Sequence, residues 1–464
     1  MVFSSLVFIF VYLVAVLAIY YITPLRWRNV FLLIINLIFY GWGEPIYVFL
    51  MLLSITVSYV FGLLVAKHRE DEVKAKRYLA ASVVIHLSLL FFFKYFDFLI
   101  TNLALIPVFS GLKPIGLALP IGISFYTFQS MSYVIDVYRR DAEAQPSFAA
   151  FGTYVSLYPQ LIAGPIVRYK DVADQMVERE HSLAKFSSGV QRFVIGLCKK
   201  VLLANSIGKL WDVYAAAGEL SVLGAWLGAI AFAFQIYFDF AGYSDMAIGL
   251  GRMLGFEFLE NFNYPYISRS ITEFWRRWHI SLGTWFREYV YIPLGGNRCS
   301  RVRNYLNIFI VWMLTGIWHG AAWNFLLWGL YYALLLIAEK LFLLKALKKA
   351  PAPLAHVYTM FFVLVGWAIF ANEGLGLVGT YLAAMFSFGG APLFLPVDGY
   401  YLANYALVLI LCAVASLPFA ANFMRKLPEA VRAIAVPVLI ALGLLLSTAY
   451  LVDATYNPFL YFRF

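Results

Sequence analysis

The sequence predicts an all-α protein that crosses a membrane many times, and three observations support this fold class. Of its 464 residues, 63% are hydrophobic and 19% are aromatic, whereas only 13% are charged. A soluble domain carries about 25% charged residues, so this chain has too few to cover a water-exposed surface of its size. In addition, apolar runs of roughly 20 residues recur, and each can cross the bilayer core as a helix. These observations exclude a soluble enzyme, a disordered chain, a secreted disulfide scaffold and a β-barrel.

The charge and the cysteine content of the chain indicate which partners and which metal or disulfide sites to expect. The chain carries 35 basic and 25 acidic side chains, a formal net charge of +10. In a membrane protein such an excess reflects basic cytoplasmic loops, so the expected partner is the lipid bilayer and not nucleic acid. The three cysteines, Cys198, Cys299 and Cys412, are far apart and none forms a CxxC pair. The sequence therefore supports neither a disulfide framework nor structural zinc, and we assign no metal ligand.

Four apolar runs organise the first hundred residues, at about 6–22, 30–42, 46–66 and 78–93. The loop after the third run is densely basic, which places it in the cytoplasm. Counting back through three crossings puts the N-terminal end outside, and the fourth run returns outward.

Pro and Gly interrupt two hydrophobic stretches, at residues 101–125 and 158–165. Broken backbone at membrane depth persists only where protein or a water-filled cavity surrounds it. Each stretch is therefore either a re-entrant element that lines a cavity or an ordinary loop at the membrane interface, and the sequence leaves both open.

The rest of the chain alternates basic amphipathic segments with apolar runs. Residues 166–212 and 261–304 are basic and are expected at the cytoplasmic face. In the second segment a helix is expected to begin at Ser268 or Ser270, because Glu273 follows Ser270 in a capping-box pattern. Further apolar runs lie at about 222–240, 246–258, 306–318, 325–338, 357–370, 377–388, 402–418 and 434–451.

These runs predict roughly eleven crossings plus re-entrant and interfacial helices. No linker is long enough to separate domains, so we expect one membrane domain over 1–464. Its parts are N-terminal helices (1–100), a core (101–345), C-terminal helices (346–452) and an aromatic tail (453–464).

His319 is the first candidate for chemistry. It ends an apolar run, and an ionisable side chain at such depth is costly, so a functional role is expected. Imidazole titrates near neutral pH, which suits a general base. Gly316 and Gly320 form a small-xxx-small pair that lets a helix or a substrate approach closely. The alternative is a hydrogen-bonded histidine that packs two helices together.

His279 lies in a second candidate motif, which is rich in Trp and Arg. On a continuous helix, Trp275 and His279 share a face at i,i+4. The guanidinium groups of Arg276, Arg277 and Arg287 could hold phosphate in a bidentate manner, as a phosphorylated donor such as a coenzyme thioester requires. The alternative is a Trp and Arg belt at the membrane interface.

Two carboxylates, Asp239 and Asp245, lie among apolar residues. They could orient a histidine or pair with an arginine, and they could equally be structural polar groups. Within the fourth apolar run, His86 is either a hydrogen-bonded core residue or a functional one. The remaining histidines lie in loops or near a helix start, where solvated or interfacial positions are expected: His68, His181 and His356.

Several catalytic signatures do not occur in the sequence, among them GxxxxGK[ST], HExxH, HxxxxD and GxSxG. A P-loop ATPase and the soluble hydrolases that use these motifs are therefore excluded.

A set of motifs occurs in a fixed order along the chain. They are PIGISFY at 120–126, LIAGP at 161–165, YFDF at 237–240, GYSD at 242–245, ENFNYPYIS at 260–268, TEFWRRWHISL at 272–282, LGGNR at 294–298 and WHG at 318–320. In these motifs the chain resembles the membrane-bound O-acyltransferase (MBOAT) family, and most of all its branch of alginate O-acetyltransferase membrane subunits. The resemblance covers nearly the whole chain.

The resemblance implies a ring of helices around a thinned centre, where cytoplasmic and outward funnels meet in a tunnel. It implies that His319 is the catalytic histidine and that His279 is the second signature histidine. The motif residues that it implies for donor or substrate binding are Arg276, Arg277, Trp278, Trp318, Asn261 and Asp245.

The implied reaction moves an acetyl group from a cytoplasmic thioester, usually acetyl-CoA, across the bacterial inner membrane. The final acceptor is an extracytoplasmic polysaccharide such as alginate, and no cofactor is bound permanently. The aromatic tail resembles a terminal Phe/Tyr motif proposed as an acyl relay. In that hypothesis His319 deprotonates Tyr461, which takes the acyl group and passes it to an SGNH-type partner acyltransferase outside. The alternative is that the tail is an interfacial aromatic anchor.

Two other functions stay open at this point. Intramembrane Asp and His with broken helices also suit a channel or transporter, although no inverted repeat is visible. The same fold could instead transfer D-alanyl groups, or acylate peptidoglycan, a lipid or a protein, because the fold alone does not name the acceptor.

Overall fold

The structure is a computed structural model that describes residues 2–161, 164–453 and 459–460. It is built from helices, and no strand occurs in this part of the chain. Backbone contacts divide the chain into two compact units, residues 1–193 with 244–259 and residues 194–243 with 260–464. The predicted all-α class is confirmed.

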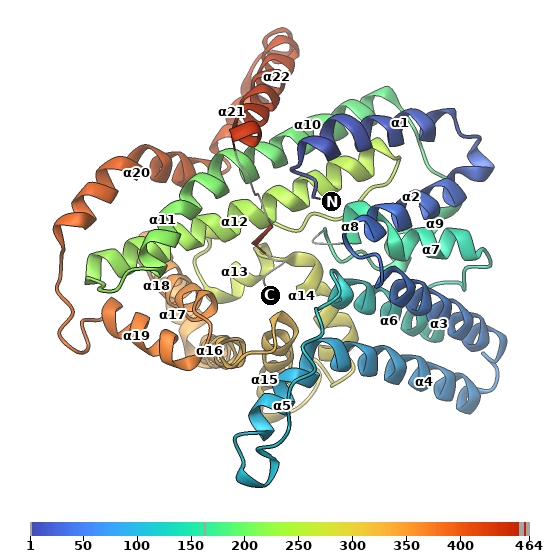
Figure 1. Cartoon of the computed structure of the whole chain (residues 1–464), viewed down its shortest axis with the longest axis horizontal. Coiled ribbons are helices and arrows are strands. Elements are labelled where there is room, and N and C mark those ends of the chain that lie inside the picture. Colours follow the sequence, from blue (N-terminus) through green and yellow to red (C-terminus); the bar gives the residue numbers. More distant parts are fainter. Residues whose placement is uncertain (1, 162–163, 454–458, 461–464) are drawn as a thin grey trace. The chain divides into compact units, whose positions relative to one another are not determined.

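The first unit holds the N-terminal helices and the end of one long helix (Figure 1). They are α1 (Leu13–Ile22), α2 (Arg28–Gly43), α3 (Val48–Lys67), α4 (Glu72–Leu90), α5 (Phe96–Leu103), α6 (Ile123–Arg139), α7 (Phe148–Ser156), α8 (Tyr158–Leu161), α9 (Tyr169–Val177), most of α10 (Leu183–Cys198) and the last turns of α12 (Val222–Met253). Here α3, α4 and α6 pack against one another, and α7 covers α2 and α3.

The second unit holds the remaining helices. They are α11 (Asn205–Ala215), the first part of α12, α13 (Ile271–Arg277), α14 (Ile280–Phe286), α15 (Arg301–His319), α16 (Trp323–Ala338), α17 (Leu344–Lys349), α18 (Ala352–Ala371), α19 (Leu375–Met385), α20 (Pro396–Ala415), α21 (Phe419–Lys426) and α22 (Glu429–Asp453). Three π-helical turns join this set, η5 (Lys199–Ala204) before α11, η7 (Arg287–Tyr291) after α14 and η8 (Glu339–Leu343) after α16.

Seven helical stretches among the described residues are long and apolar enough to cross a membrane. They span Val48–Lys67, Glu72–Leu103, Val222–Met253, Trp323–Lys349, Ala352–Ala371, Pro396–Ala415 and Glu429–Asp453, and two shorter apolar helices span Phe8–Ile22 and Leu375–Met385. This is a multi-pass membrane protein. Other apolar runs of the sequence form helices that are shorter or more polar, such as α2 and α15, so fewer than eleven stretches reach this length and apolarity.

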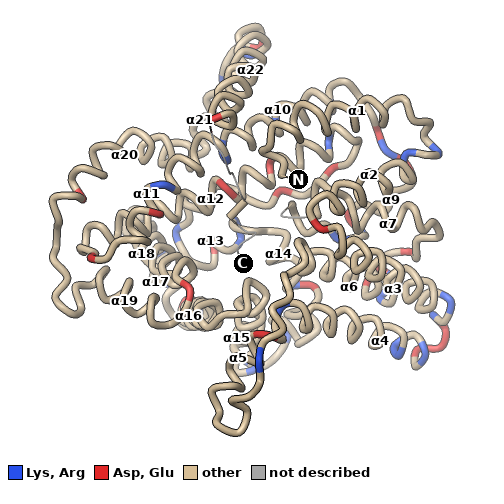
Figure 2. Tube along the Cα trace, in the orientation of Figure 1, with Lys and Arg blue, Asp and Glu red and all other residues tan. Residues whose placement is uncertain are grey.

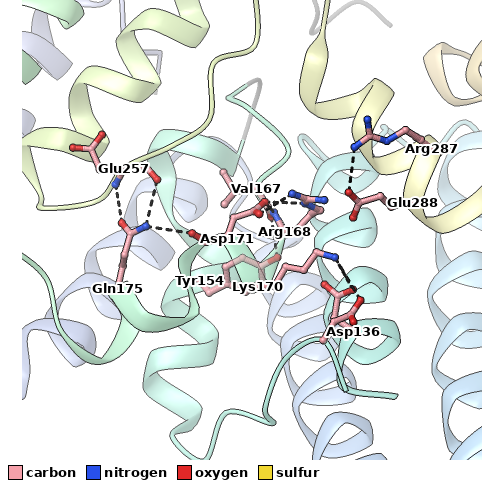
Figure 3. A network of polar contacts seen from close by, with 11 residues as sticks. Asp136, Tyr154, Val167, Arg168, Lys170, Asp171, Gln175, Glu257, Arg287 and Glu288 are labelled. Carbon is pink, nitrogen blue, oxygen red and sulfur yellow. Dashed lines mark hydrogen bonds and ion pairs between the residues drawn. The ribbon is translucent and has the colours of Figure 1, made fainter. Parts of the chain in front are cut away.

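Charged residues are sparse along the helices and gather at their ends, as Figure 2 shows for the turn between α3 and α4. That turn is the basic loop of the sequence, and it pairs with the end of α6. Arg69 contacts Glu143 at 2.8 Å, and Arg140 contacts Glu70 at 3.6 Å. A short helix of the same unit, α9, is held by a polar network (Figure 3). Its Asp171 pairs with Arg168 at 2.7 Å, while Gln175 accepts the backbone N–H of Glu257 at 2.7 Å.

The two interrupted stretches of the sequence behave differently. Residues 105–119 are exposed and form a loop, and the carboxylate of Asp97 holds it by accepting the N–H groups of Ile115 and Gly116 at 2.8 and 2.9 Å. These exposed residues fit the loop interpretation of this stretch. In the second stretch, α8 is buried inside the first unit, as a re-entrant element would be, and residues 162–163 lie outside the described part.

Candidate active site

The first predicted histidine, His279, lies where the chain turns sharply between two short helices. The helix α13 begins as expected at Ser270, whose hydroxyl accepts the N–H of Glu273 at 3.0 Å. It ends at Arg277, however, and His279 adopts φ +46°. The prediction that Trp275 and His279 share a face of one helix is therefore wrong.

The cause of this break is a backbone pairing that helix propensity does not reveal. The N–H of Asn263 donates to the carbonyl of Arg277 at 2.9 Å, and the N–H of Ile280 donates to the carbonyl of Asn261 at 3.0 Å. Between these two bonds Trp278 is extended, because a continuing helix would have to give up both of them. The preceding segment, 261–263, thus sets the position of His279.

The amide of Asn261 orients the imidazole of His279. Its Oδ1 accepts the N–H and the hydroxyl of Ser281 at 3.2 and 2.9 Å, which identifies this atom as the oxygen. The Nδ1 of His279 lies 3.1 Å from the same oxygen and must donate to it. The Nε2 atom then carries the lone pair, and within the described part of the chain it has no hydrogen-bond partner. This nitrogen is therefore able to accept a hydrogen bond, while burial lowers the pKa of His279 to about 3.

The second predicted histidine, His319, is the last residue of α15 and is 6% exposed. It is positioned by the close packing of α15 on α16. A Cβ on Gly329 would lie 2.6 Å from the carbonyl oxygen of Trp312 and 3.3 Å from the Cα of Gly316, so only glycines permit this crossing. The predicted role of Gly316 in close approach is confirmed, and the partner is the helix α16. Rings of Trp328 and Phe370 then face the imidazole at centroid distances of 5.0 and 5.3 Å.

Both histidines line one cavity of about 160 Å³ within the second unit. Its wall comes from α13, α14, η7 and the last three turns of α15, and its lining residues are Trp275, Trp278, His279, Leu282, Gly283, Phe286, Arg287, Tyr291, Val311, Trp312, Thr315 and His319. The ring of Trp318 lies 6.0 Å from that of His279 and 5.1 Å from that of His319, so the two imidazoles lie near the same end of the cavity. Val311 lies eight residues before His319, about 12 Å along the helix, and the side chains of η7 line the cavity towards that end.

Of the predicted arginines, Arg287 lines this cavity and Arg276 and Arg277 do not. Arg276 is exposed, while Arg277 pairs with Glu273 at 2.9 Å and donates to the carbonyl of Asn263 at 3.0 Å. Arg287 is 60% exposed and contacts the neighbouring Glu288 at 3.4 Å, as Figure 3 also draws. The two ends of the cavity therefore differ: Arg287 places a cation near solvent at one end, and the two imidazoles lie at the other.

Aromatic side chains form the rest of the site. Trp278 lines the cavity, and the ring of Trp318 lies 6.0 Å from that of His279, so both predicted tryptophans are next to a histidine. The rings of Trp275 and Trp312, with centroids 4.7 Å apart, pack against each other in the wall of the cavity. Trp312 and Thr315 were not predicted as site residues, although Val311, Thr315 and His319 recur at i,i+4 and indicate the lining face of α15.

One carboxylate that sequence reasoning missed positions the site from outside the cavity. Glu339 of η8 is fully buried and accepts the N–H groups of Ile271 and Thr272 at 2.7 and 2.8 Å. It also accepts the hydroxyl of Thr272 at 2.6 Å. A carboxylate at these unpaired N–H groups anchors the start of α13, the helix that leads to His279.

The two predicted aspartates pair with cations, and neither lines the cavity. Asp245 belongs to the first unit, where it contacts Arg192 at 2.6 Å. Asp239 of α12 contacts Lys200 at 2.5 Å and accepts the N–H of Leu460 at 2.7 Å. Of the roles that the sequence left open, arginine pairing is the one that the structure gives to Asp245.

The predicted relay residue, Tyr461, lies outside the described residues. Its neighbours in the tail are described: Phe459 is 1% exposed, and its ring lies 4.6 Å from that of Tyr243 and 6.0 Å from that of Phe240. The ring of Phe240 in turn lies 4.7 Å from that of His279. Phe459 is thus buried inside the second unit, one aromatic ring away from His279.

The other histidines have structural partners. His86 is buried, with Nδ1 2.8 Å from the carbonyl of Ser82 and Nε2 3.0 Å from the hydroxyl of Ser58. Of the two alternatives for this residue, the structure therefore supports the hydrogen-bonded core histidine. His181 is not simply solvated as expected, since Tyr20 and Arg28 contact its ring at 3.0 and 3.1 Å.

Comparisons with known proteins identify the family of this chain. The model of the membrane-bound O-acyltransferase family matches residues 86–371, which include both histidines. The chain is 45% identical over 392 residues to a probable alginate O-acetylase of Azotobacter vinelandii, covering 84% of this chain and 79% of that protein. It is 33% identical over 427 residues to a peptidoglycan O-acetyltransferase of Helicobacter pylori, covering 84% and 81%. A teichoic acid D-alanyltransferase of Bacillus subtilis is 29% identical over 272 residues, covering 54% and 69%.

The family match spans well over half of the chain and contains the cavity with its two imidazoles, and relatives matched along most of their length carry the names of acyl-transferring enzymes. This chain belongs to the membrane-bound O-acyltransferase family, and it is an O-acyltransferase of the membrane.

Proposed function

We propose that this enzyme moves an acetyl group from a cytoplasmic acyl thioester, acetyl-CoA by preference, to an extracytoplasmic polysaccharide of the alginate type. The observation that carries the proposal is the single cavity lined by His279 and His319. The names of the alginate and peptidoglycan O-acetylating relatives support acetyl as the group and a glycan as the acceptor.

In the proposed reaction, His319 acts as the general base and takes the proton of the attacking hydroxyl. The hydroxyl oxygen bonds to the thioester carbonyl carbon, the bond from that carbon to sulfur breaks, and the thiolate leaves. His279 accepts a hydrogen bond or a proton through Nε2, the nitrogen that Asn261 leaves free. Arg287 holds a phosphate of the donor at the other end of the cavity.

The attacking hydroxyl in this proposal is that of Tyr461, and an SGNH-type acyltransferase outside the inner membrane receives the group next. Phe459, two residues before Tyr461 in the sequence, is buried beside Phe240, and this burial near the site supports the hypothesis. Tyr461→Phe should abolish acetylation of the exported polymer without changing the amount of protein in the membrane. Normal acetylation by this variant would remove the relay step and leave the rest of the proposal to be judged by the histidines.

The two histidines give the main test. His319→Ala and His279→Ala should each lower the O-acetyl content of the exported polymer by about 10² to 10⁴, the usual contribution of a general base. His86→Ala is the matched control, because it removes a buried imidazole that lies outside the cavity. Polymer acetylation at the normal level in both site variants, measured by NMR of the purified polysaccharide, would end the proposal.

The donor end can be tested with arginines. Arg287→Ala should raise the concentration of acetyl-CoA needed for half-maximal transfer by about tenfold, since one charge-assisted phosphate contact is worth roughly 1.4 kcal/mol or more. Arg276→Ala also removes one positive charge, from a side chain of the same segment that lies outside the cavity. It should change the acetyl-CoA concentration for half-maximal transfer by less than about twofold. Equal effects of both variants would contradict a phosphate site at Arg287.

D-alanyl transfer is the second candidate, and the match to a D-alanyltransferase favours it. The two donors leave different esters, so the released acid identifies the group. After mild alkaline hydrolysis of the polymer, acetate supports the first proposal and D-alanine the second.

A further inference from the structure

A group of basic side chains in the first unit has fewer acidic partners than its charge requires. It lies where the end of α1, the start of α2 and the segment before α10 meet, and we call it the Arg28 cluster. Its members are Tyr20, Arg28, Arg179, His181 and Lys185. None of them belongs to the cavity with the catalytic histidines.

Arg28 is the centre of this cluster and is only 9% exposed. Its Nε donates to the carbonyl of Thr23 at 3.1 Å, and its Nη1 donates to Nε2 of His181 at 3.1 Å. The guanidinium also lies over the ring of Tyr20, 4.8 Å from the centroid. No carboxylate of the described chain lies within ion-pair distance of Arg28, so these contacts orient the charge without neutralising it.

Arg179 repeats this arrangement beside it. One of its nitrogens donates to the side-chain oxygen of Asn29 at 2.8 Å, and its guanidinium lies 4.6 Å from the ring centroid of Phe256. Arg179 also has no carboxylate within ion-pair distance in the part of the chain that the structure describes. The guanidinium groups of Arg28 and Arg179 therefore lie in one region, and the groups that contact them there are neutral.

The acidic groups nearby do not balance the charge. Glu257 is shared between Lys185 and Arg252, each at 3.4 Å. The end of α12 contributes the carbonyl of Leu254, which accepts the hydroxyl of Tyr20 at 2.8 Å, and a helix C-terminus supplies about half a negative charge. Within the described chain, Glu257 and this partial charge are thus the counter-charges for four cations, which are Arg28, Arg179, Lys185 and Arg252. Because buried charge without a counter-charge is costly, an anion bound at Arg28 and Arg179 would stabilise this region.

The surroundings of the cluster indicate where that anion comes from. The segment from the end of α1 to the start of α2 exposes large apolar side chains, with Ile22 82%, Leu25 73% and Trp27 54% exposed. Such a surface makes no favourable contact with a free inorganic anion, whereas it can pack against the acyl chains of a lipid. Basic pockets at the ends of membrane helices are suited to anionic lipid headgroups, and the positive-inside rule predicts the cytoplasmic leaflet for this one.

We propose that the Arg28 cluster binds the phosphate group of an anionic phospholipid, with Arg28 and Arg179 as the phosphate ligands and the apolar segment at residues 22–27 against the acyl chains. The site is separate from acyl transfer, so it can be tested whether or not the proposed reaction is correct.

The experiment titrates the purified full chain in neutral detergent with phosphatidylglycerol, phosphatidylcholine or inorganic phosphate, and follows the thermal unfolding midpoint by tryptophan fluorescence. Phosphatidylglycerol should raise the midpoint saturably, with half-saturation at a concentration at least tenfold lower than for the other two. Equal shifts with phosphatidylcholine would overturn the preference for an anionic headgroup. An equal shift with inorganic phosphate would overturn the assignment to a lipid.

Variants then locate the site. Arg28→Gln and Arg179→Gln should each raise the half-saturating concentration of phosphatidylglycerol at least tenfold. Arg26→Gln is the matched control, because it removes an exposed charge two residues from Arg28, and it should change this concentration less than twofold. Should Arg28→Gln fail to fold, Arg28→Lys keeps the charge and should still lose affinity because it lacks the planar fork. An equal effect of Arg26→Gln and Arg179→Gln would show non-specific surface charge and overturn the proposal.

Discussion

The side-chain amide of Asn261 decides which nitrogen of His279 can accept a proton. Its oxygen receives two hydrogen bonds from Ser281 and a third from Nδ1 of His279. The sequence could indicate the histidine, because an imidazole in an apolar, Trp-rich segment is unusual. It could not indicate the orienting amide, since that residue lies eighteen positions earlier in the chain.

Replacement of Asn261 tests this orientation. Asn261→Ala should lower acyl transfer by about tenfold or more, because the free imidazole no longer presents Nε2 as the basic nitrogen. Asn261→Asp should instead shift the acid limb of the pH–activity profile to higher pH, because a carboxylate favours the protonated imidazole. Asn263→Ala, at an exposed position nearby, is the control and should leave both the rate and the profile unchanged.

His181 gives the protein a pH-dependent stability. Burial, followed by the charge of Arg28, lowers the pKa of His181 from its ordinary value. The unfolded chain then binds this proton more readily than the folded chain, so the stabilisation from neutral His181 is complete above the ordinary pKa of about 6.5 and is lost as the pH falls below it. The unfolding midpoint in detergent should decrease between pH 7 and pH 5.

The control for this effect is His181→Gln, which keeps a polar side chain and cannot titrate. Its unfolding midpoint should change less over the same pH interval, with Arg28, Arg179 and Lys185 still present around the site. A slope as steep as that of the unmodified protein would assign the pH dependence to other groups.

At the scale of elements, the pair α15 and α16 determines where His319 lies. The sequence predicted close approach through Gly316, and the structure adds Gly329 of α16 as its counterpart. The pairing could not be predicted in detail, because small residues are compatible with several neighbours. Helix ends were more predictable: Ser270 begins α13 as its capping pattern indicated, whereas the end at Arg277 depends on pairing with residues 261–263.

Gly329→Ala tests the crossing of these helices. The added Cβ would lie 2.6 Å from the carbonyl oxygen of Trp312, so the helices must separate, at a cost of about 1–3 kcal/mol. We expect a lower unfolding midpoint and reduced acyl transfer, since His319 moves with α15. Gly379→Ala on α19 is the matched control, because a Cβ there meets no atom within 4 Å and alanine favours a helix. A midpoint that falls equally in both variants would contradict this account.

At the scale of the whole molecule, composition and loop charge predict the orientation in the membrane. The basic loop after α3 is expected in the cytoplasm and the exposed loop at residues 105–119 outside. In a variant without native cysteines, a membrane-impermeant maleimide should label Lys113→Cys in intact spheroplasts and Lys76→Cys only after permeabilisation. Both positions are exposed, so access depends on the side of the membrane alone. The cysteine-free chain gives the background, and the reverse labelling pattern would refute the orientation.

The sequence by itself determined the membrane fold class and the family, and it singled out the two histidines that line the cavity, because these depend on composition, on the length of apolar runs and on short local motifs. The tertiary structure decided which arginine reaches the cavity, which amide orients His279 and that Glu339 anchors α13. The physical reason is distance along the chain: such contacts join residues from different helices, and no local pattern encodes which surfaces meet. For Tyr461 the sequence gives a hypothesis, and its test is the phenylalanine variant.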